Sequence, residues 1–136
     1  MKHRHDSVDD PRSVAREAAL SLLYEAETKE ASPRSILDAQ VVEADSAVAL
    51  LVRGVHDASE RIDSLIAEHA HGWELERMAS LDRNILRIAT FELIGRPDVP
   101  VAVILNEAVE LAKRFGTDDS GRFVNGVLSG VAKSVR

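Results

Sequence analysis

The sequence contains no cysteine among its 136 residues. This absence excludes disulfide-stabilised folds, cysteine-based zinc sites and thiol nucleophiles, and it fits a reducing compartment. Aromatic residues make up only 4% of the chain, and Tyr24 is the single tyrosine. Only four prolines are present, and each stands where a helix is expected to begin or end.

Long apolar runs are also missing. The longest, residues 47–52, is far shorter than the ~20 residues that a membrane-spanning helix needs. The first residues lack the apolar core of a secretory signal peptide. We therefore expect a cytoplasmic protein that does not enter a membrane. Its length and its 45% hydrophobic content predict one domain that buries its own core.

Motifs of catalysis and metal binding are absent too. The sequence has no glycine-rich phosphate loop, no H-E-x-x-H and no nucleophile elbow. His3/His5 and His69/His71 form H-x-H pairs, but side chains at i and i+2 of a helix point about 200° apart and cannot share an ion. We expect no metal, no cofactor and no enzymatic activity.

Four acidic residues allow a catalytic and a structural interpretation. Glu92 and Glu107 lie within apolar helical segments. Each could act as a catalytic acid, but a buried carboxylate paired with an arginine or a backbone amide is the favoured interpretation. The Asp118-Asp119 pair is better explained as a helix cap.

Apolar residues recur at spacings of three and four, which predicts helices throughout. We expect an all-α fold of about seven helices, in which residues 1–9 form a flexible tail and residues 10–136 a single domain. The expected helices span residues 10–30, 33–40, 43–70, 80–94, 101–115 and about 119–136, with a short turn at 73–78. Gly54, inside the longest of them, predicts close packing or a bend.

The formal net charge of −6 argues at first against nucleic acid as a ligand. The acidity is confined to residues 17–76, which carry a net charge of −9, whereas residues 1–16 carry +1 and residues 77–136 carry +2. The two ends of the chain could therefore still meet in a basic surface.

Arg12 and Arg16 stand four residues apart at the start of the first expected helix, after Lys2 and Arg4. Basic side chains at a helix N-terminus suit a phosphate backbone. The alternative is an ordinary solvated face.

Arg122 and Phe123, beside Asn125, fall in the first turn of the last expected helix. Such a group can contact phosphate, stack on a base and bind a base edge. The alternative is that Phe123 belongs to the core. Tyr24 could lie near the same surface or fill the bundle.

Several segments together resemble the NusB family of bacterial transcription antitermination factors. They are LDRNILRIATFEL at 81–93, DVP at 98–100 followed by NEAVELAK at 106–113, and FVNGVL at 123–128. AREA at 15–18 and LLY at 22–24 also match. The resemblance is weak over residues 27–50.

The resemblance implies an all-α fold of two packed three-helix subdomains and a non-enzymatic role. That role is binding of the boxA element of ribosomal RNA leader transcripts as a heterodimer with NusE, the small-subunit ribosomal protein S-ten. The heterodimer joins other Nus factors on RNA polymerase. Position by position, the RNA-contacting candidates are Arg12, Arg16, Tyr24, Arg122 and Phe123, and the NusE-facing candidate is Asp82.

Ser13 and Val14 interrupt the arginine run that is common in the family, and three aspartates precede it. We therefore expect modest RNA affinity without NusE. Two alternatives remain. One is a helical RNA-binding module of a ribosomal RNA methyltransferase system, although we expect no room in this chain for a methyl-donor-binding domain. The other is a protein-binding adaptor that never touches RNA. A free homodimer is also plausible, because an exposed apolar surface can pair with itself.

Overall fold

A computed structural model describes residues 11–40 and 43–136. The described residues form seven α-helices and one 3₁₀ turn, and they contain no strand. In chain order these elements are α2 (Pro11–Thr28), α3 (Pro33–Asp38), α4 (Ser46–Asp57), α5 (Ser59–His69), η1 (Leu75–Arg77), α6 (Ser80–Gly95), α7 (Val101–Phe115) and α8 (Ser120–Val135). The predicted all-α fold is confirmed. Over the described residues, no helix combines the length and apolar character needed to cross a membrane.

Prolines and polar caps set several of the helix starts. Pro11 begins α2 and Pro33 begins α3, because proline at the first helical position loses no hydrogen bond. The hydroxyl of Ser32 accepts a hydrogen bond from the N–H of Ser35 at 3.1 Å, as the cap-then-proline pattern predicts. The expected tail at residues 1–9 and the expected helix start at residue 10 lie outside the described residues.

The single long helix expected over residues 43–70 is wrong. The chain breaks at Ala58 (φ −105°, ψ 22°) into α4 and α5. The break redirects the chain, since α4 packs on α2, α3 and α6 whereas α5 packs on α6 and α8. Val55 and Ile62 are both buried and seven residues apart, so the apolar stripe continues through the break and gives no sign of it.

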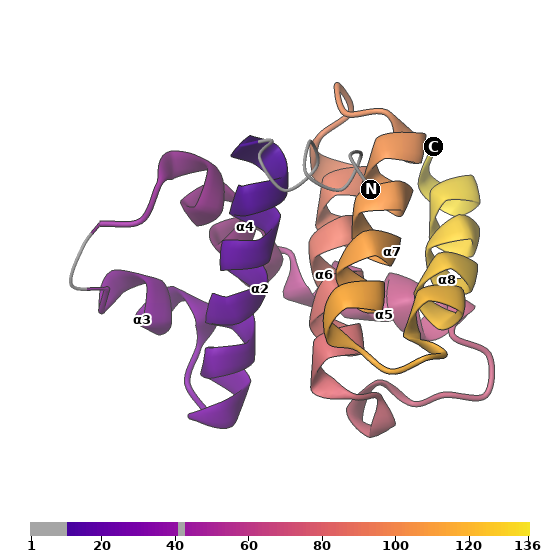
Figure 1. The fold of residues 1–136 in the computed structure, drawn as a ribbon, viewed down its shortest axis with the longest axis horizontal. Coiled ribbons are helices and arrows are strands. Elements are labelled where there is room, and N and C mark those ends of the chain that lie inside the picture. The colour runs from indigo at the N-terminus through magenta and orange to yellow at the C-terminus, as the bar shows by residue number, and fades with distance from the viewer. Residues whose placement is uncertain (1–10, 41–42) are drawn as a thin grey trace.

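The helices form two groups (Figure 1). α2, α3 and α4 lie on one side, and α6, α7 and α8 pack against one another on the other, with α5 behind them. α2 also packs on α6 and so joins the groups, and buried residues from all seven helices form one hydrophobic cluster. The predicted pair of packed three-helix subdomains is confirmed, with α5 as an additional helix against the second.

Glycines allow two close approaches between helices. A Cβ atom on Gly54 of α4 would lie 2.3 Å from the ring of Phe91 on α6, and one on Gly130 of α8 would lie 2.7 Å from the ring of His69 on α5. Gly126, in contrast, faces open space. Of these two glycines of α8, only Gly130 therefore lies at a close approach between helices.

Candidate nucleic-acid interface

Arg16, predicted to contact RNA, lies in the interior with 4% of its surface exposed. Its Nε and Nη2 atoms donate to the two carboxylate oxygens of Glu92 on α6 at 2.8 and 2.9 Å. Its Nη1 lies 3.7 Å from Glu107 on α7. The structure contradicts the solvated placement that a phosphate contact would need. The reason is that Arg16 shares a helix face with buried Ala19 and Leu23.

The same contact explains Glu92. This carboxylate is 3% exposed and receives a bidentate, charge-assisted pair from Arg16. The favoured structural interpretation of Glu92, a buried acid paired with an arginine, is therefore confirmed. A second contact lies beside it, because the hydroxyl of Ser13 donates to Glu107 at 2.6 Å. Together these bonds fix the first turns of α2, including exposed Arg12, against α6 and α7.

Arg122 and Phe123 lie in the first turn of α8. The side chain of Arg122 is 86% exposed, and its Nη1 is 4.0 Å from Asp119. Such an exposed pair holds the guanidinium weakly. Phe123 is partly buried against the core, and its ring meets that of Trp73 edge-on, with centroids 5.9 Å apart and planes at 64°. The core interpretation of Phe123 therefore holds in part, and its stacking on an RNA base stays a prediction.

A hollow of about 420 Å³ opens beside Phe123, and we call it the aromatic hollow. Asp82, predicted to face NusE, borders the same hollow. Its wall residues come from the segment before α6, the first turn of α6 and the start of α8: Trp73, Arg77, Met78, Ala79, Asp82, Thr117, Asp119, Ser120 and Phe123. The sequence predictions missed Trp73, which is 53% exposed. Its signal was a lone tryptophan placed in a turn and not in an apolar stripe.

Tyr24 lies at the other end of α2 from Arg12. It is 45% exposed and borders a shallow hollow of about 230 Å³ together with Leu81 and Phe115. Leu81 and Asp82 are consecutive residues in the first turn of α6, so this turn borders both hollows.

The predicted contacts therefore form two separate sets. Arg12 stands twelve residues before Tyr24 on α2, about 18 Å along the helix axis. Figure 1 shows that the start of α2 and the start of α8 lie at opposite ends of the bundle. Tyr24, Asp82, Arg122 and Phe123 share one end, and Arg12 marks the other.

An ion-pair network fixes the end that carries Tyr24. Glu27 of α2 accepts hydrogen bonds from Ser80 at 2.7 Å, Arg83 at 2.8 Å and Arg87 at 2.8 Å, and Arg87 also forms a bidentate pair with Asp63 of α5 at 2.9 and 3.0 Å. Partial burial acts to raise the pKa of Glu27, but the hydrogen bonds from Arg83 and Ser80 and the two guanidinium charges outweigh it and lower that pKa to about 2. The hydrogen bond to Glu27 raises the pKa of Arg83 in turn.

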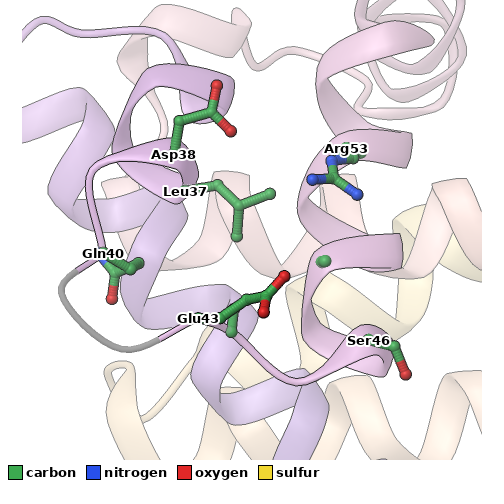
Figure 2. A pocket seen from close by; sticks show the side chains of 8 residues that line it. Leu37, Asp38, Gln40, Glu43, Ser46 and Arg53 are labelled. Carbon is green, nitrogen blue, oxygen red and sulfur yellow. The ribbon is translucent and has the colours of Figure 1, made fainter.

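Another hollow, of about 620 Å³, lies elsewhere, between α3 and α4. Asp38 and Arg53 stand on opposite walls with Leu37 between them (Figure 2). None of the residues predicted to bind RNA or NusE lines this hollow. Most of the RNA and partner candidates therefore lie at the bundle end described above and not at this hollow.

Comparison with known proteins decides the family. The sequence model of the NusB family matches residues 13–133. The chain belongs to the NusB family. It is 44% identical over 124 residues to the transcription antitermination protein NusB of Bacillus licheniformis, and the match covers 88% of this chain and 95% of that protein.

Solved NusB structures share the fold. T. maritima NusB superposes with a TM-score of 0.81 at 36% sequence identity, covering 90% of this chain and 91% of that one. A chain from the crystal structure of antitermination factors NusB and NusE in complex with double-stranded RNA superposes with a TM-score of 0.76 at 28% identity, covering 90% and 96% of the two chains. The resemblance to NusB noted in the sequence is confirmed.

Proposed function

We propose that this chain is a transcription antitermination factor that binds boxA RNA of ribosomal RNA leader transcripts as a heterodimer with NusE. The observation that carries the proposal is the likeness over 90% of the chain to a component of the NusB–NusE–RNA complex. Its relatives are antitermination proteins matched over nearly their whole length. Membership of this family gives the chain a binding role and not an enzymatic one.

On this proposal the RNA follows the bundle end that carries Tyr24, Arg122 and Phe123. Arg122 offers an exposed cation, and Phe123 and Tyr24 offer aromatic surface for unstacked bases. Arg12, at the far end of α2, gives a second phosphate contact to a longer RNA. Arg16 acts indirectly: its pair with Glu92 holds the first turns of α2 in place.

NusE completes the site. Residues 17–76 carry a net charge of −9, so the helices formed by this segment attract a basic ribosomal protein and repel RNA phosphates. Asp82 stands beside Phe123 on the aromatic hollow, where a partner and the RNA can meet. The chain alone therefore binds RNA weakly, and NusE supplies the missing positive charge.

We also propose that the heterodimer works in the cytoplasm and assembles with other Nus factors on RNA polymerase. The methyltransferase-module alternative loses support, because the matched relatives are antitermination proteins of about this length. The adaptor alternative differs in one respect, since it predicts that no residue of this chain touches RNA.

Ultraviolet crosslinking distinguishes the RNA-binding antitermination factor from the protein-binding adaptor. We expect boxA RNA bound to the heterodimer to crosslink to peptides that contain Tyr24 or Phe123. A scrambled RNA of equal length is the control. Crosslinks confined to NusE would favour the protein-binding adaptor.

A further inference from the structure

We propose that Arg136, which caps the end of α8, is a positioning residue for RNA binding: it fixes the last turn of α6, and this turn fixes the start of α2 with its exposed Arg12. The inference rests on the proposed RNA-binding function and adds a residue that acts on the RNA only through other residues. It starts from a cluster of backbone carbonyl groups that surround one guanidinium.

The guanidinium of Arg136 binds four backbone carbonyl groups at and after the end of α6. Its Nε donates to Leu93 at 2.8 Å, and its Nη1 donates to Val99 at 2.9 Å. Its Nη2 donates to Arg96 at 2.9 Å and to Glu92 at 3.3 Å. The last carbonyl groups of a helix lack partners within the helix, and a cation that donates to them stabilises the final turn. Arg136 therefore ties the end of α8 to the last turn of α6 and to the loop before α7.

The same turn of α6 holds the start of α2. Glu92 uses its backbone carbonyl for Arg136 and its carboxylate for the bidentate pair with Arg16, at 2.8 and 2.9 Å. Arg16 and Glu92 are 4% and 3% exposed, and a buried ion pair is favourable only where its geometry is good. A shift in the backbone of Glu92 would therefore loosen Arg16 and the first turns of α2.

α2 begins beside the end of α6, because the two helices run antiparallel. Near the end of α2, Glu27 accepts a hydrogen bond from Ser80 at the start of α6 at 2.7 Å. Near the start of α2, Arg16 pairs with Glu92 in the last turns of α6. Arg12 precedes Arg16 by about one turn, so it lies toward the end of the bundle that the carbonyl cluster stabilises. The position of Arg12 thus depends on the last turn of α6.

The contacts of Arg136 favour positioning over a phosphate contact of its own. All three of its guanidinium nitrogens donate to backbone oxygens, and a turn toward phosphate would give these bonds up. Arg122 differs, since its side chain is 86% exposed and lies 4.0 Å from its acidic neighbour. The two arginines of α8 therefore have different roles, one toward the fold and one toward RNA.

The first test compares the salt dependence of RNA affinity among heterodimers with NusE. Arg12→Ala removes the proposed phosphate contact and should reduce the slope of log affinity against log salt by about 0.7. Arg136→Ala should also reduce the slope, by no more than that amount, and the double variant should match Arg12→Ala alone. Lys133→Ala, which removes an exposed cation about one turn earlier on α8, is the matched control and should leave the slope unchanged.

Arg136→Lys distinguishes positioning from a direct phosphate contact. A single ammonium keeps the charge but cannot reproduce the planar set of donors that reaches both α6 and the loop, so we expect the reduced slope here too. A slope equal to that of the unaltered chain, or additive losses for Arg12→Ala and Arg136→Ala, would show that Arg136 binds phosphate itself and would overturn the proposal.

Hydrogen exchange of the chain without RNA tests the link directly. We expect the backbone amides of residues 15–20 in α2 to exchange several times faster in Arg136→Ala and in Arg136→Lys than in Lys133→Ala. The amides of α4, which Arg136 does not contact, are the internal reference and should be unchanged. Unchanged exchange at the start of α2 would overturn the proposal, and so would an equal increase throughout the chain, which would indicate a general loss of stability.

The inference and the function can fail separately. If Arg12→Ala reduces the slope but neither Arg136 variant does, the positioning role is wrong and the proposed function stands. If Arg12→Ala leaves the slope unchanged, the RNA contact proposed at the start of α2 is wrong, and the positioning role is wrong with it. If the heterodimer shows no preference for boxA RNA over a scrambled RNA, the proposed function itself fails.

Discussion

At the scale of single residues, two arginines of the same predicted role have opposite environments. Arg16 is buried in a bidentate pair with Glu92, and Arg122 extends into solvent. Buried and exposed ion pairs respond differently to the loss of one partner. Removal from a buried pair leaves an uncompensated charge, whereas removal at the surface has little effect on stability.

We therefore expect Arg16→Ala to lower the free energy of unfolding by about 3–5 kcal/mol, because Glu92 would remain buried without its cation. Urea denaturation measures this loss. Arg122→Ala is the control and should change stability by less than about 1 kcal/mol. An Arg16→Ala variant that keeps its stability and loses only RNA affinity would show that Arg16 is a phosphate contact after all.

Arg122→Ala should act on RNA binding instead. Loss of one phosphate contact reduces the slope of log affinity against log salt by about 0.7 for a single-stranded RNA. Titrations of the heterodimer at several salt concentrations measure the slope. Arg34→Ala removes an exposed arginine on α3, which is not among the predicted RNA contacts, and should leave the slope unchanged; equal slopes for both variants would contradict a phosphate contact at Arg122.

At the scale of the elements, helix contacts depend on glycine and on ion pairs. Gly54→Ala would place a methyl group against Phe91, so we expect a loss of about 1–3 kcal/mol from overpacking. A Cβ at Gly126 would face open space. Gly126→Ala should therefore be neutral or raise stability by up to about 1 kcal/mol, because alanine has the higher helix propensity. Thermal denaturation compares the two variants, and equal shifts in both would contradict the close approach of α4 and α6.

The Glu27 network gives the contact between α2 and α6 a pH dependence. The pKa of Glu27 is about 2 in the folded chain against an ordinary value of 4.5, so its stabilising effect is fully present above pH 4.5 and is lost as the pH falls from 4.5 to 2. We expect Glu27→Gln to be less stable at pH 7 and to lose less stability over that acid range. Urea denaturation at several pH values measures both, and parallel curves for the two proteins would contradict the shifted pKa.

Helix boundaries could be predicted where local chemistry sets them. Ser32-Pro33 marks the start of α3 and Pro100 precedes α7, since caps and prolines act on their own turn. The break at Ala58 could not, because it depends on which helices the two halves meet. Gly116 shows the same limit: its φ is −97°, which any residue can adopt, and the need for glycine comes from the packing, because a Cβ would meet Ser120 at 2.4 Å.

Side chains of the candidate site could likewise be predicted only where the local sequence decides their environment. Spacing alone placed Arg16 with Arg12 on a basic face, although burial beside Ala19 and Leu23 depends on the position of α6. Arg122 could be predicted as an exposed cation because it lies in a polar first turn. The contact between Trp73 and Phe123 joins residues fifty positions apart, and only the packed structure brings them together.

At the scale of the whole molecule, charge divides the work between this chain and NusE. The net charge of −6 opposes RNA, and the exposed cations near the aromatic hollow are few. A basic partner on the acidic helices reverses the sign of the local field. We infer that the free chain can instead pair with itself through exposed Tyr24, Trp73 and Phe115, and light scattering with and without NusE tests this.

The central measurement is the affinity of boxA RNA for this chain alone, for NusE alone and for the two together, with a scrambled RNA beside each. The account predicts weak binding by either protein and at least about tenfold tighter, boxA-selective binding by the pair, equivalent to at least about 1.4 kcal/mol of coupling. If adding NusE brings neither tighter binding nor preference for boxA, the account of this chain as the NusE-dependent RNA-binding subunit is contradicted.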